Sequence, residues 1–225
     1  MADLRVVAIV PAYNEAEFIH QTVTALSGIT AITKVLVVDD ASTDNTATLA
    51  ARAGAGVITL EKNMGKGEAL NTGVQAAPAD IYLLLDGDLG ASASDAEHLL
   101  KPVLAGQADM TVAQFPPARR KGGFGMVKRL ARWGILLFTG QNMKSPLSGQ
   151  RAMTRAVLES VYPFASGYGV EVGMTIKAAR MGYRVLEVPV QMTHAETGRD
   201  IKGFRHRGKQ FWHITRTLLR VAVLK

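Results

Sequence analysis

The stretch Ile81 to Leu85 reads Ile-Tyr-Leu-Leu-Leu and runs directly into Asp86-Gly87-Asp88. A short apolar run of this kind predicts a buried β-strand, and the glycine lets the backbone turn sharply between two carboxylates. Taken alone, Asp-Gly-Asp is common turn material that caps a following helix. Two close carboxylates also repel unless a cation neutralises them, and their hard oxygens favour Mg²⁺ or Mn²⁺ bridging to a phosphate. The neighbouring segments decide between a turn and a metal site.

Upstream of this stretch, β-branched runs alternate with helical patterns. The alternation predicts an α/β fold with a mostly parallel central sheet flanked by helices on both faces. Ligands in such sheets bind beyond the carboxyl ends of the strands. The predicted strands are Leu4 to Val10, Lys34 to Val38, Val57 to Leu60 and Ile81 to Leu85, and the helices are Glu17 to Leu26, Asn45 to Ala53 and Lys66 to Ala77. Later segments predict helices near Thr154 to Ser160, Val170 to Met181 and from about Lys209, a strand at Val185 to Val190, and a loop running into a basic helix from Phe115 to Arg132.

Three of the predicted strands end in polar residues. Pro11 to Glu15 follows the first strand and Asp39-Asp40 follows the second, one βα unit before Asp86-Gly87-Asp88. The second pair reads either as a helix N-cap or as carboxylates that accept hydrogen bonds from a base edge or a ribose hydroxyl. Ser42 and Asp44 are also good caps, so we expect Asp39 and Asp40 to remain free for a ligand.

The segment Gly65-Lys66-Gly67-Glu68-Ala69 opens the third predicted helix. Free N–H groups at a helix start, together with the Lys66 ammonium, favour an anionic diphosphate. The Walker spacing of a P-loop is absent, so ATP hydrolysis is not inferred.

Composition narrows the class of protein. The 225 residues fit one domain, 1–225, in which residues 1–114 and 115–225 form two halves. Apolar residues make up 48%, and the absence of cysteine excludes disulfides and thiolate chemistry. Lysine and arginine exceed the acidic residues by 26 − 19 = 7, which favours an anionic partner. Without a leader pattern or an apolar run of about 20 residues, a cytoplasmic location is expected, with peripheral contact at the inner face of the membrane left open.

Four motifs, taken in order, resemble glycosyltransferase family 2 and its GT-A relatives. They are Val10–Glu15, Val38–Asp44, Gly65–Gly67 and Asp86–Asp88. The resemblance implies a GT-A, Rossmann-like fold and a UDP-sugar donor. It makes residues 1–114 the nucleotide-sugar-binding half and residues 115–225 the acceptor half. It implies that Asp86 and Asp88, around Gly87, hold Mg²⁺ or Mn²⁺ on the diphosphate. It assigns the nucleoside to Asp40 and to the segment Pro11, Ala12, Tyr13, Asn14 and Glu15.

The second half is similar to the glucosyl- and mannosyl-3-phosphoglycerate synthases at Gly167–Gly173, and Gly65–Ala69 in the first half matches the same enzymes. That similarity implies His194 as a third metal ligand, although a lone histidine is usually an ordinary residue. Glu171 reads either as a helix-face residue or as a carboxylate beside the sugar that binds its hydroxyls or acts as a base. Arg199 reads either as part of a solvated loop or as a group that meets the diphosphate once the donor binds. Ser148, Gly149 and Arg151 resemble the family's acceptor-side Ser-Gly-x-Arg segment, or else form a capped loop.

Basic patches bear on the acceptor. Polyprenyl-phosphate sugar synthases share the same core, so Arg119–Lys121, Lys128–Arg132 and Lys202–Lys209 are either a lipid-phosphate surface or a solubilising exterior. The apolar face of the C-terminal helix fits a core contact, a homodimer contact or a bilayer interface. No nucleic-acid partner is expected.

The sequence therefore predicts a metal-dependent hexosyltransferase, with UDP-glucose as the favoured donor and a phosphorylated or lipid-phosphate acceptor. Glu171, Asp88, Lys66 and Arg199 are its candidate catalytic residues. Two rivals remain: a sugar-nucleotide pyrophosphorylase, which would need a glycine-rich N-terminal loop, and a catalytically silent nucleotide-sugar-binding protein on the same fold. Whether transfer inverts or retains configuration is left open.

Overall fold

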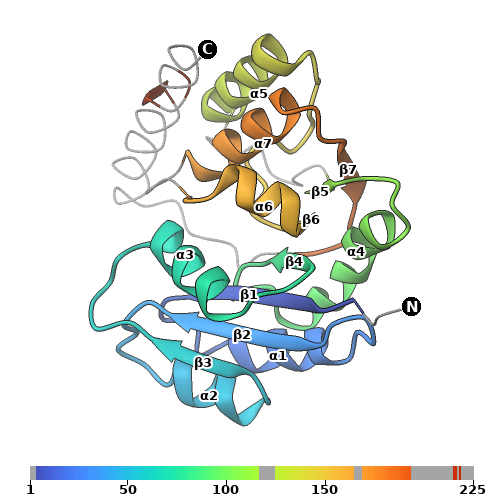
Figure 1. The fold of residues 1–225 in the computed structure, drawn as a ribbon. Coiled ribbons are helices and arrows are strands. Elements are labelled where there is room, and N and C mark those ends of the chain that lie inside the picture. Colours follow the sequence, from blue (N-terminus) through green and yellow to red (C-terminus); the bar gives the residue numbers. More distant parts are fainter. Residues whose placement is uncertain (1–3, 117–124, 165–168, 194–214, 217, 219–225) are drawn as a thin grey trace.

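A computed structural model describes residues 4–116, 125–164, 169–193, 215, 216 and 218. Within them, seven strands form one sheet in the order β3-β2-β1-β4-β6-β5-β7 (Figure 1). The strands are β1 (Val6–Ala12), β2 (Lys34–Asp39), β3 (Gly56–Thr59), β4 (Ile81–Leu84), β5 (Met110–Gln114), β6 (Arg151–Thr154) and β7 (Val185–Pro189).

The N-terminal part of the sheet is parallel. β1 lies between β2 and β4, and Ile9 pairs with Leu36 on one side and Leu84 on the other. Every residue of β1 is buried, because helices cover both faces of the sheet and leave apolar side chains as the stable choice along a strand. The carboxyl ends of β1, β2 and β4 consequently meet at one edge.

β6 is the strand that breaks the parallel pattern. It runs antiparallel to both β4 and β5, and Arg151 at its start pairs with Leu84 at the end of β4. This reversal brings the residues that precede β6, Ser148 to Gln150, to the same edge as Asp86. Residues of the second half thus join the strand ends of the first.

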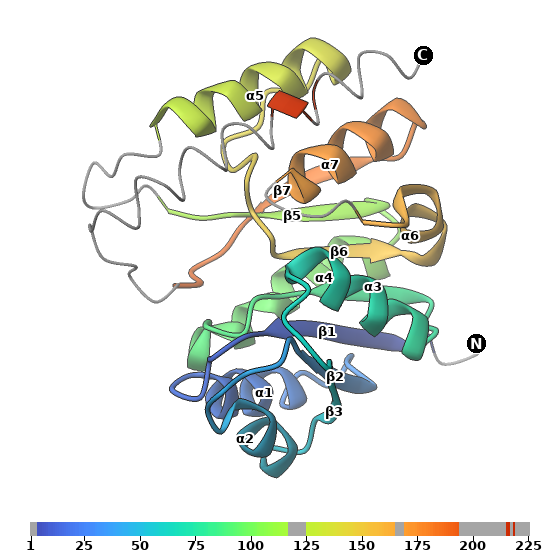
Figure 2. The ribbon, with the colours of Figure 1, turned by 90° about the vertical axis from the view of Figure 1, so that its left-hand side faces the viewer.

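Helices cover the sheet on both faces (Figures 1 and 2). One apolar core lies under α3, α5, α6 and α7, and a second lies under α1, α2, the 3₁₀ helix η1 and α4. Their bounds are α1 (Ile19–Ser27), α2 (Thr46–Arg52), α3 (Lys66–Ala76), η1 (Gly90–Ala96), α4 (Glu97–Leu104), α5 (Gly125–Thr139), α6 (Arg155–Val161) and α7 (Val170–Arg180). In the described part of the chain, none of these helices is long and apolar enough to cross a bilayer.

The close contact of α3 with the sheet depends on Gly73. A Cβ atom there would lie 2.5 Å from Ile9 Cγ2 and 3.1 Å from Val38 Cγ2, which is tighter than packed side chains allow. The glycine lets α3 lie directly on β1 and β2 and so fixes where the helix begins, at Lys66.

The predicted alternation of strands and helices in the first half is confirmed, with ends displaced by at most two residues, as in Leu4 to Val10 against the observed Val6–Ala12. The basic helix predicted to end at Arg132 continues as α5 to Thr139. The segments that sequence reasoning missed are η1, α4, β5 and β6. The basic helix predicted from about Lys209 lies almost wholly outside the described residues.

Candidate functional site

A cleft of about 200 Å³ opens at the carboxyl ends of β1, β2 and β4. Its lining comes from four segments that are distant in sequence, as the strand-end motifs predict. The lining residues are Pro11, Ala12, Tyr13, Glu15, Asp40, Lys66, Ala69, Asp86, Gly87 and Asp88. All of the predicted donor-side residues except Asn14 are therefore brought together here.

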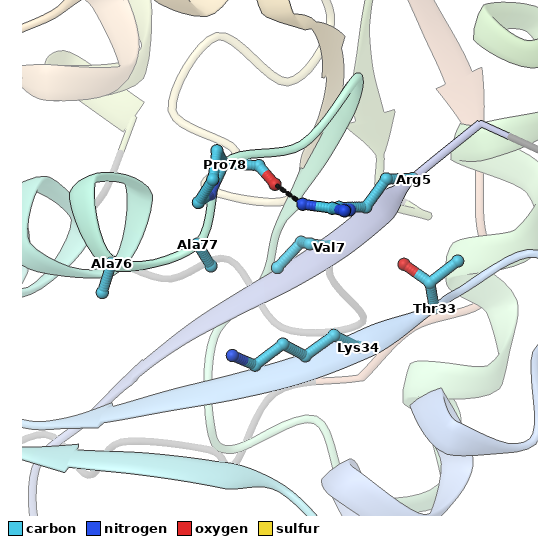
Figure 3. Close-up of a pocket in the computed structure, with 7 residues that line it drawn as sticks. All are labelled: Arg5, Val7, Thr33, Lys34, Ala76, Ala77 and Pro78. Atoms are coloured by element: carbon cyan, nitrogen blue, oxygen red, sulfur yellow. Dashed lines mark hydrogen bonds between the residues drawn. The ribbon is translucent and has the colours of Figure 1, made fainter.

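A larger hollow of about 510 Å³ lies at the opposite end of the strands (Figure 3). It lies where β1 and β2 begin. There the Arg5 side chain donates a hydrogen bond of 3.3 Å from Nη1 to the Pro78 carbonyl. Its lining is Arg5, Val7, Thr33, Lys34, Ala76, Ala77 and Pro78, which includes no carboxylate. Because parallel sheets bind ligands at the carboxyl ends of their strands, the smaller cleft is the candidate site.

The loops after β1 and β2 are tied to each other by hydrogen bonds. The Asn14 amide donates to Ser42 Oγ at 2.9 Å, and Asn14 Oδ1 accepts from the Thr43 amide at 2.8 Å. The Glu15 amide donates to Thr46 Oγ1 at 2.8 Å. Asn14 has φ 56°, a left-handed conformation that asparagine tolerates better than most residues. Asn14 thus joins the two loops, and the neighbouring Tyr13 side chain is left 46% exposed at the cleft.

The expectation that Asp40 remains free is wrong. Its side chain is 3% exposed, Oδ1 accepts from the Met64 amide and Oδ2 from the Gly65 amide, both at 2.7 Å. Asp39 is likewise engaged, since its Oδ1 accepts from the Ser42 amide at 3.3 Å. A carboxylate has about four acceptor positions, so contact of Asp40 with a nucleoside stays a prediction. What the geometry adds is that Asp40 fixes the turn that leads into Lys66.

Lys66 lies between two carboxylates from different parts of the chain. Its Nζ is 2.6 Å from Asp86 Oδ1 and 3.5 Å from Glu171 Oε1. Burial lowers the pKa of the Lys66 ammonium, but the charges of Asp86 and Glu171 outweigh that effect and raise the pKa above its usual value. Lys66 is therefore a fixed cation at neutral pH. Glu171, at the start of α7, faces this array, in agreement with its predicted place beside the site.

Two residues that sequence reasoning did not select hold the Asp-Gly-Asp turn in place. Gln150 Nε2 donates to Asp86 Oδ2 at 2.7 Å. Thr22 Oγ1 donates to the Gly87 carbonyl at 2.9 Å and accepts from the Gly90 amide at 2.8 Å. The only sequence signal for Gln150 is its place inside the Ser-Gly-x-Arg segment. Thr22 has none, because it reads as one more buried position of an amphipathic helix.

Of the three predicted acceptor-side residues, Ser148, Gly149 and Arg151, one lies beside the cleft residues and two are buried. Gly149 borders Lys66 and Asp86, whereas Ser148 is 6% exposed and Arg151 is fully buried. Arg151 Nε donates to the Ser148 carbonyl at 3.0 Å and Nη1 to Thr175 Oγ1 at 2.8 Å. Within the described residues Nη2 has no partner.

The Arg151 guanidinium is buried and is not among the residues that line the cleft, but it is close enough to Glu171 for their charges to interact. Burial lowers the pKa of Arg151 to about 10, and the charge of Glu171 partly offsets this change. Arg151 thus remains charged at neutral pH, and Glu171 has a second cation near it.

The carboxylates of Asp86 and Asp88 both line the cleft and are partly exposed. Their hard oxygens suit Mg²⁺ or Mn²⁺. Asp86 already contacts Lys66 and Gln150, but a carboxylate has about four acceptor positions. The two residues fit a divalent ion. In the described part of the chain no three acidic or histidine side chains converge as a complete metal cage. The predicted third ligand His194, and the predicted diphosphate contact Arg199, lie outside the described residues.

A mostly parallel sheet whose strand ends gather an acidic turn, a lysine and an exposed tyrosine defines the GT-A class of nucleotide-sugar-binding fold. The chain belongs to glycosyl transferase family 2, since the model of that family matches residues 7–161.

Relatives in sequence fall into several groups. The chain is 32% identical over 198 residues to glycosyltransferase AglJ of Haloferax volcanii, covering 84% of this chain and 63% of the relative. It is 31% identical over 191 residues to glucosyl-3-phosphoglycerate synthase of Mycobacterium tuberculosis, covering 75% and 59%. It is 30% identical over 215 residues to undecaprenyl-phosphate mannosyltransferase of Micrococcus luteus, covering 87% and 86%. The chain thus spans under two thirds of the first two relatives.

The fold matches solved structures of the Mycobacterium tuberculosis glucosyl-3-phosphoglycerate synthase. One contains Mn²⁺, UDP-glucose and phosphoglyceric acid and superposes with a TM-score of 0.82 at 27% identity, over 97% of this chain and 80% of that one. Another contains Mg²⁺ and UDP and gives a TM-score of 0.82 at 26% identity, over 97% and 79%.

Proposed function

We propose that this protein transfers a hexose, with glucose favoured, from a UDP-sugar to an anionic acceptor in the presence of Mg²⁺ or Mn²⁺. The observation that carries the proposal is the Lys66 ammonium, held between Asp86 and Glu171 in a cleft that the ends of β1, β2 and β4 and the start of α3 line. Metal and UDP-glucose in the solved relative support the same reading.

Each wall of the cleft has a part in donor binding. The exposed ring of Tyr13 and the segment from Pro11 to Glu15 would hold the nucleoside, with Asp40 behind them. Asp86 and Asp88 would hold the divalent ion, which neutralises charge on the diphosphate as it leaves.

Lys66 would supply a second, permanent positive charge to the departing diphosphate. Charge develops on that group as the anomeric bond breaks, and a cation held in position stabilises it better than mobile water does. Glu171 would bind sugar hydroxyls, oriented by its ion pair with Lys66 and by the nearby buried charge of Arg151. Arg199 would meet the diphosphate once the donor is in place.

Two acceptor classes are consistent with the positive charge of the chain. One is a small phosphorylated acid, as in the relatives that act on phosphoglycerate, and the other is a lipid phosphate, as in the undecaprenyl-phosphate enzyme. Both carry a phosphate. In the phosphorylated acid a nearby hydroxyl would receive the sugar, and in the lipid an oxygen of the phosphate itself would receive it. The acceptor half of the site therefore stays open to both.

The experiment is release of UDP from UDP-glucose with Mn²⁺, measured with 3-phosphoglycerate and with a polyprenyl phosphate in detergent. Wild-type protein should release UDP with one acceptor and be stabilised thermally by UDP with Mn²⁺. Asp88→Ala should lose both effects, whereas Glu97→Ala, an exposed carboxylate on α4, should keep them. Unchanged UDP affinity in Asp88→Ala would remove the metal assignment.

The same experiment separates the rival functions. Thermal stabilisation by UDP-glucose without release of UDP for any acceptor would favour a binding protein without catalysis. Formation of UTP from UDP-glucose and pyrophosphate would favour a pyrophosphorylase. Arg199→Ala should reduce turnover more than UDP affinity, and an unaltered rate would exclude Arg199 from the reaction.

A further inference from the structure

The outward face of α5 carries an unusual group of large apolar side chains. Met126 is 67% exposed, Trp133 and Leu137 are each 59% exposed, and Leu136 is 43% exposed. Positions 126, 133 and 137 lie on one stripe, since seven and four residues are each close to a whole number of helical turns. The opposite side of α5 is already packed, with Val127, Ala131, Gly134 and Ile135 buried. The outer stripe is thus a second apolar face.

Exposed apolar residues elsewhere in the described chain are scattered singly, such as Leu4, Leu104 and Leu186 on three different segments. Single exposed residues of this kind are normal, whereas a contiguous group indicates an interaction surface. Four large, exposed apolar side chains within one 15-residue helix therefore indicate an interaction surface.

The charges on α5 indicate what kind of partner fits. Lys128, Arg129 and Arg132 flank the apolar stripe, and the helix contains no acidic residue. In the described part of the chain, none of the three cations forms an ion pair. Arg129 Nε donates to the Gly125 carbonyl at 3.2 Å and Arg132 Nε to Asn142 Oδ1 at 2.6 Å. The face therefore combines apolar and aromatic groups with uncompensated positive charge.

We propose that the outward face of α5, defined by Met126, Lys128, Arg129, Arg132, Trp133, Leu136 and Leu137, docks on the surface of an anionic lipid bilayer. An interfacial helix buries its apolar stripe between headgroups while its lysines and arginines meet lipid phosphates. Tryptophan favours the same boundary, because its ring is apolar and its N–H is polar. With 15 residues the helix is too short to span a bilayer, which takes about 20.

A second copy of the chain is a poorer partner for this face. In a two-fold symmetric contact the same patch meets itself, so the cations of one α5 would approach those of the other without a carboxylate to neutralise them. A surface rich in phosphate removes that repulsion and replaces it with attraction.

The position of α5 agrees with docking on an extended surface. Figures 1 and 2 both show α5 along the outer edge of the molecule, at the end opposite α2. Docking would also concentrate the protein on lipid-phosphate acceptors, which are one of the two acceptor classes above. That last consequence rests on the proposed function, whereas the docking itself does not.

The test is flotation of the full chain with vesicles of phosphatidylcholine alone and of phosphatidylcholine mixed with phosphatidylglycerol. We expect binding to the anionic vesicles, little binding to the neutral ones, and release at high salt. Lys128→Gln with Arg129→Gln should weaken binding about fivefold for each cation removed. Trp133→Gln with Leu137→Gln should weaken it about tenfold or more.

Matched controls use similar side chains away from α5. Leu104→Gln with Leu186→Gln removes two exposed apolar residues, and Arg52→Gln with Lys101→Gln removes two surface cations. Both control proteins should bind anionic vesicles as the wild type does. In a Trp212→Phe background, Trp133 is the one tryptophan left, and its emission should shift to shorter wavelength on anionic vesicles.

Three results would overturn the proposal: equal binding to both vesicle types, α5 variants that bind like the controls, or Trp133 emission unchanged by vesicles. A dimer in light scattering that the α5 variants dissociate, with no vesicle binding, would assign the face to a second copy instead. UDP release in detergent is measured in parallel. Loss of vesicle binding with UDP release intact defeats only the docking, and the reverse result defeats only the proposed function.

Discussion

Gly149 lies against the ammonium group of Lys66, so that a Cβ atom on residue 149 would overlap Nζ and stand 3.3 Å from Asp86 Oδ2. Residue 149 therefore leaves room for the Lys66 ammonium because glycine has no side chain. The ion pair of Lys66 with Asp86 therefore depends on the absence of a Cβ atom at Gly149.

Gly149→Ala should displace the lysine from Asp86. Lys66 is flexible at its far end, so the fold should tolerate the change, whereas the charge aimed at the diphosphate should move. We expect UDP release to fall about tenfold to a hundredfold with little change in melting temperature. The control is Gly125→Ala, where a Cβ meets nothing within 4 Å. Equal rates in the two variants would contradict the prediction.

Arg151→Met should destabilise the protein. The substitution keeps most of the buried volume but removes the donors to the Ser148 carbonyl and Thr175 Oγ1, and hydrogen bonds from charged groups contribute more than neutral ones. We expect a loss of about 2 kcal/mol or more in the free energy of unfolding, measured in urea. Arg155→Met is the comparison, because Arg155 pairs with Asp80 at the surface. A loss no larger than that of Arg155→Met would show that Arg151 contributes little.

Gly73→Ala tests the contact between α3 and the sheet. Alanine favours a helix over glycine by about 1 kcal/mol, but a Cβ here would meet Ile9 Cγ2 at 2.5 Å, and overpacking costs about 1 to 3 kcal/mol. The cost of the clash should equal or exceed the gain in helix propensity, so stability should not rise. The clash should also displace α3, and with it Lys66 at the start of the helix. Calorimetry and UDP affinity measure the two effects, and a clear gain in stability would refute the tight contact.

Asp109 predicts a dependence of stability on pH. Hydrogen bonds from Arg184 hold the pKa of Asp109 below its ordinary value, despite an opposing effect of burial. A carboxylate whose folded pKa is lowered stabilises the fold above its unfolded pKa of about 3.9, and this contribution is lost as pH falls through the folded pKa. Asp109→Asn should thus be less stable than wild type at neutral pH, and the gap should close in acid. A gap that persists unchanged down to pH 3 would rule out this linkage.

Much of the first half was predictable because each strand and helix there has a recognisable pattern within its own short stretch of sequence. β1, β2 and β4 are buried on both faces, so their apolar runs stand out between amphipathic helices, and the motifs at their ends follow from parallel pairing. Nearly all of the residues predicted to contact a donor thus line one cleft, and their contact with a donor stays a prediction. β6 was missed because it is four residues long and begins with an arginine, which seldom occupies a strand in the core.

The partners of individual side chains were not predictable for a different reason. Asp40 bonds to Met64 and Gly65, and Lys66 reaches Asp86 and Glu171. No periodicity encodes such contacts between residues far apart in sequence, since they arise only when the sheet order is set. Hence Asp40 was expected to be free, and Gln150 was not selected although it holds Asp86.

The reversed direction of β6 has a consequence for how the chain can be divided. A fragment ending at residue 114 would contain the four family motifs. It would lack Gly149, Gln150 and Glu171, which contact or adjoin Asp86 and Lys66. It would also expose the edge of β4 that β6 covers. Residues 1–114 are therefore not a module that can be moved intact: grafted onto another scaffold, they would carry the motifs without the contacts that position Asp86 and Lys66.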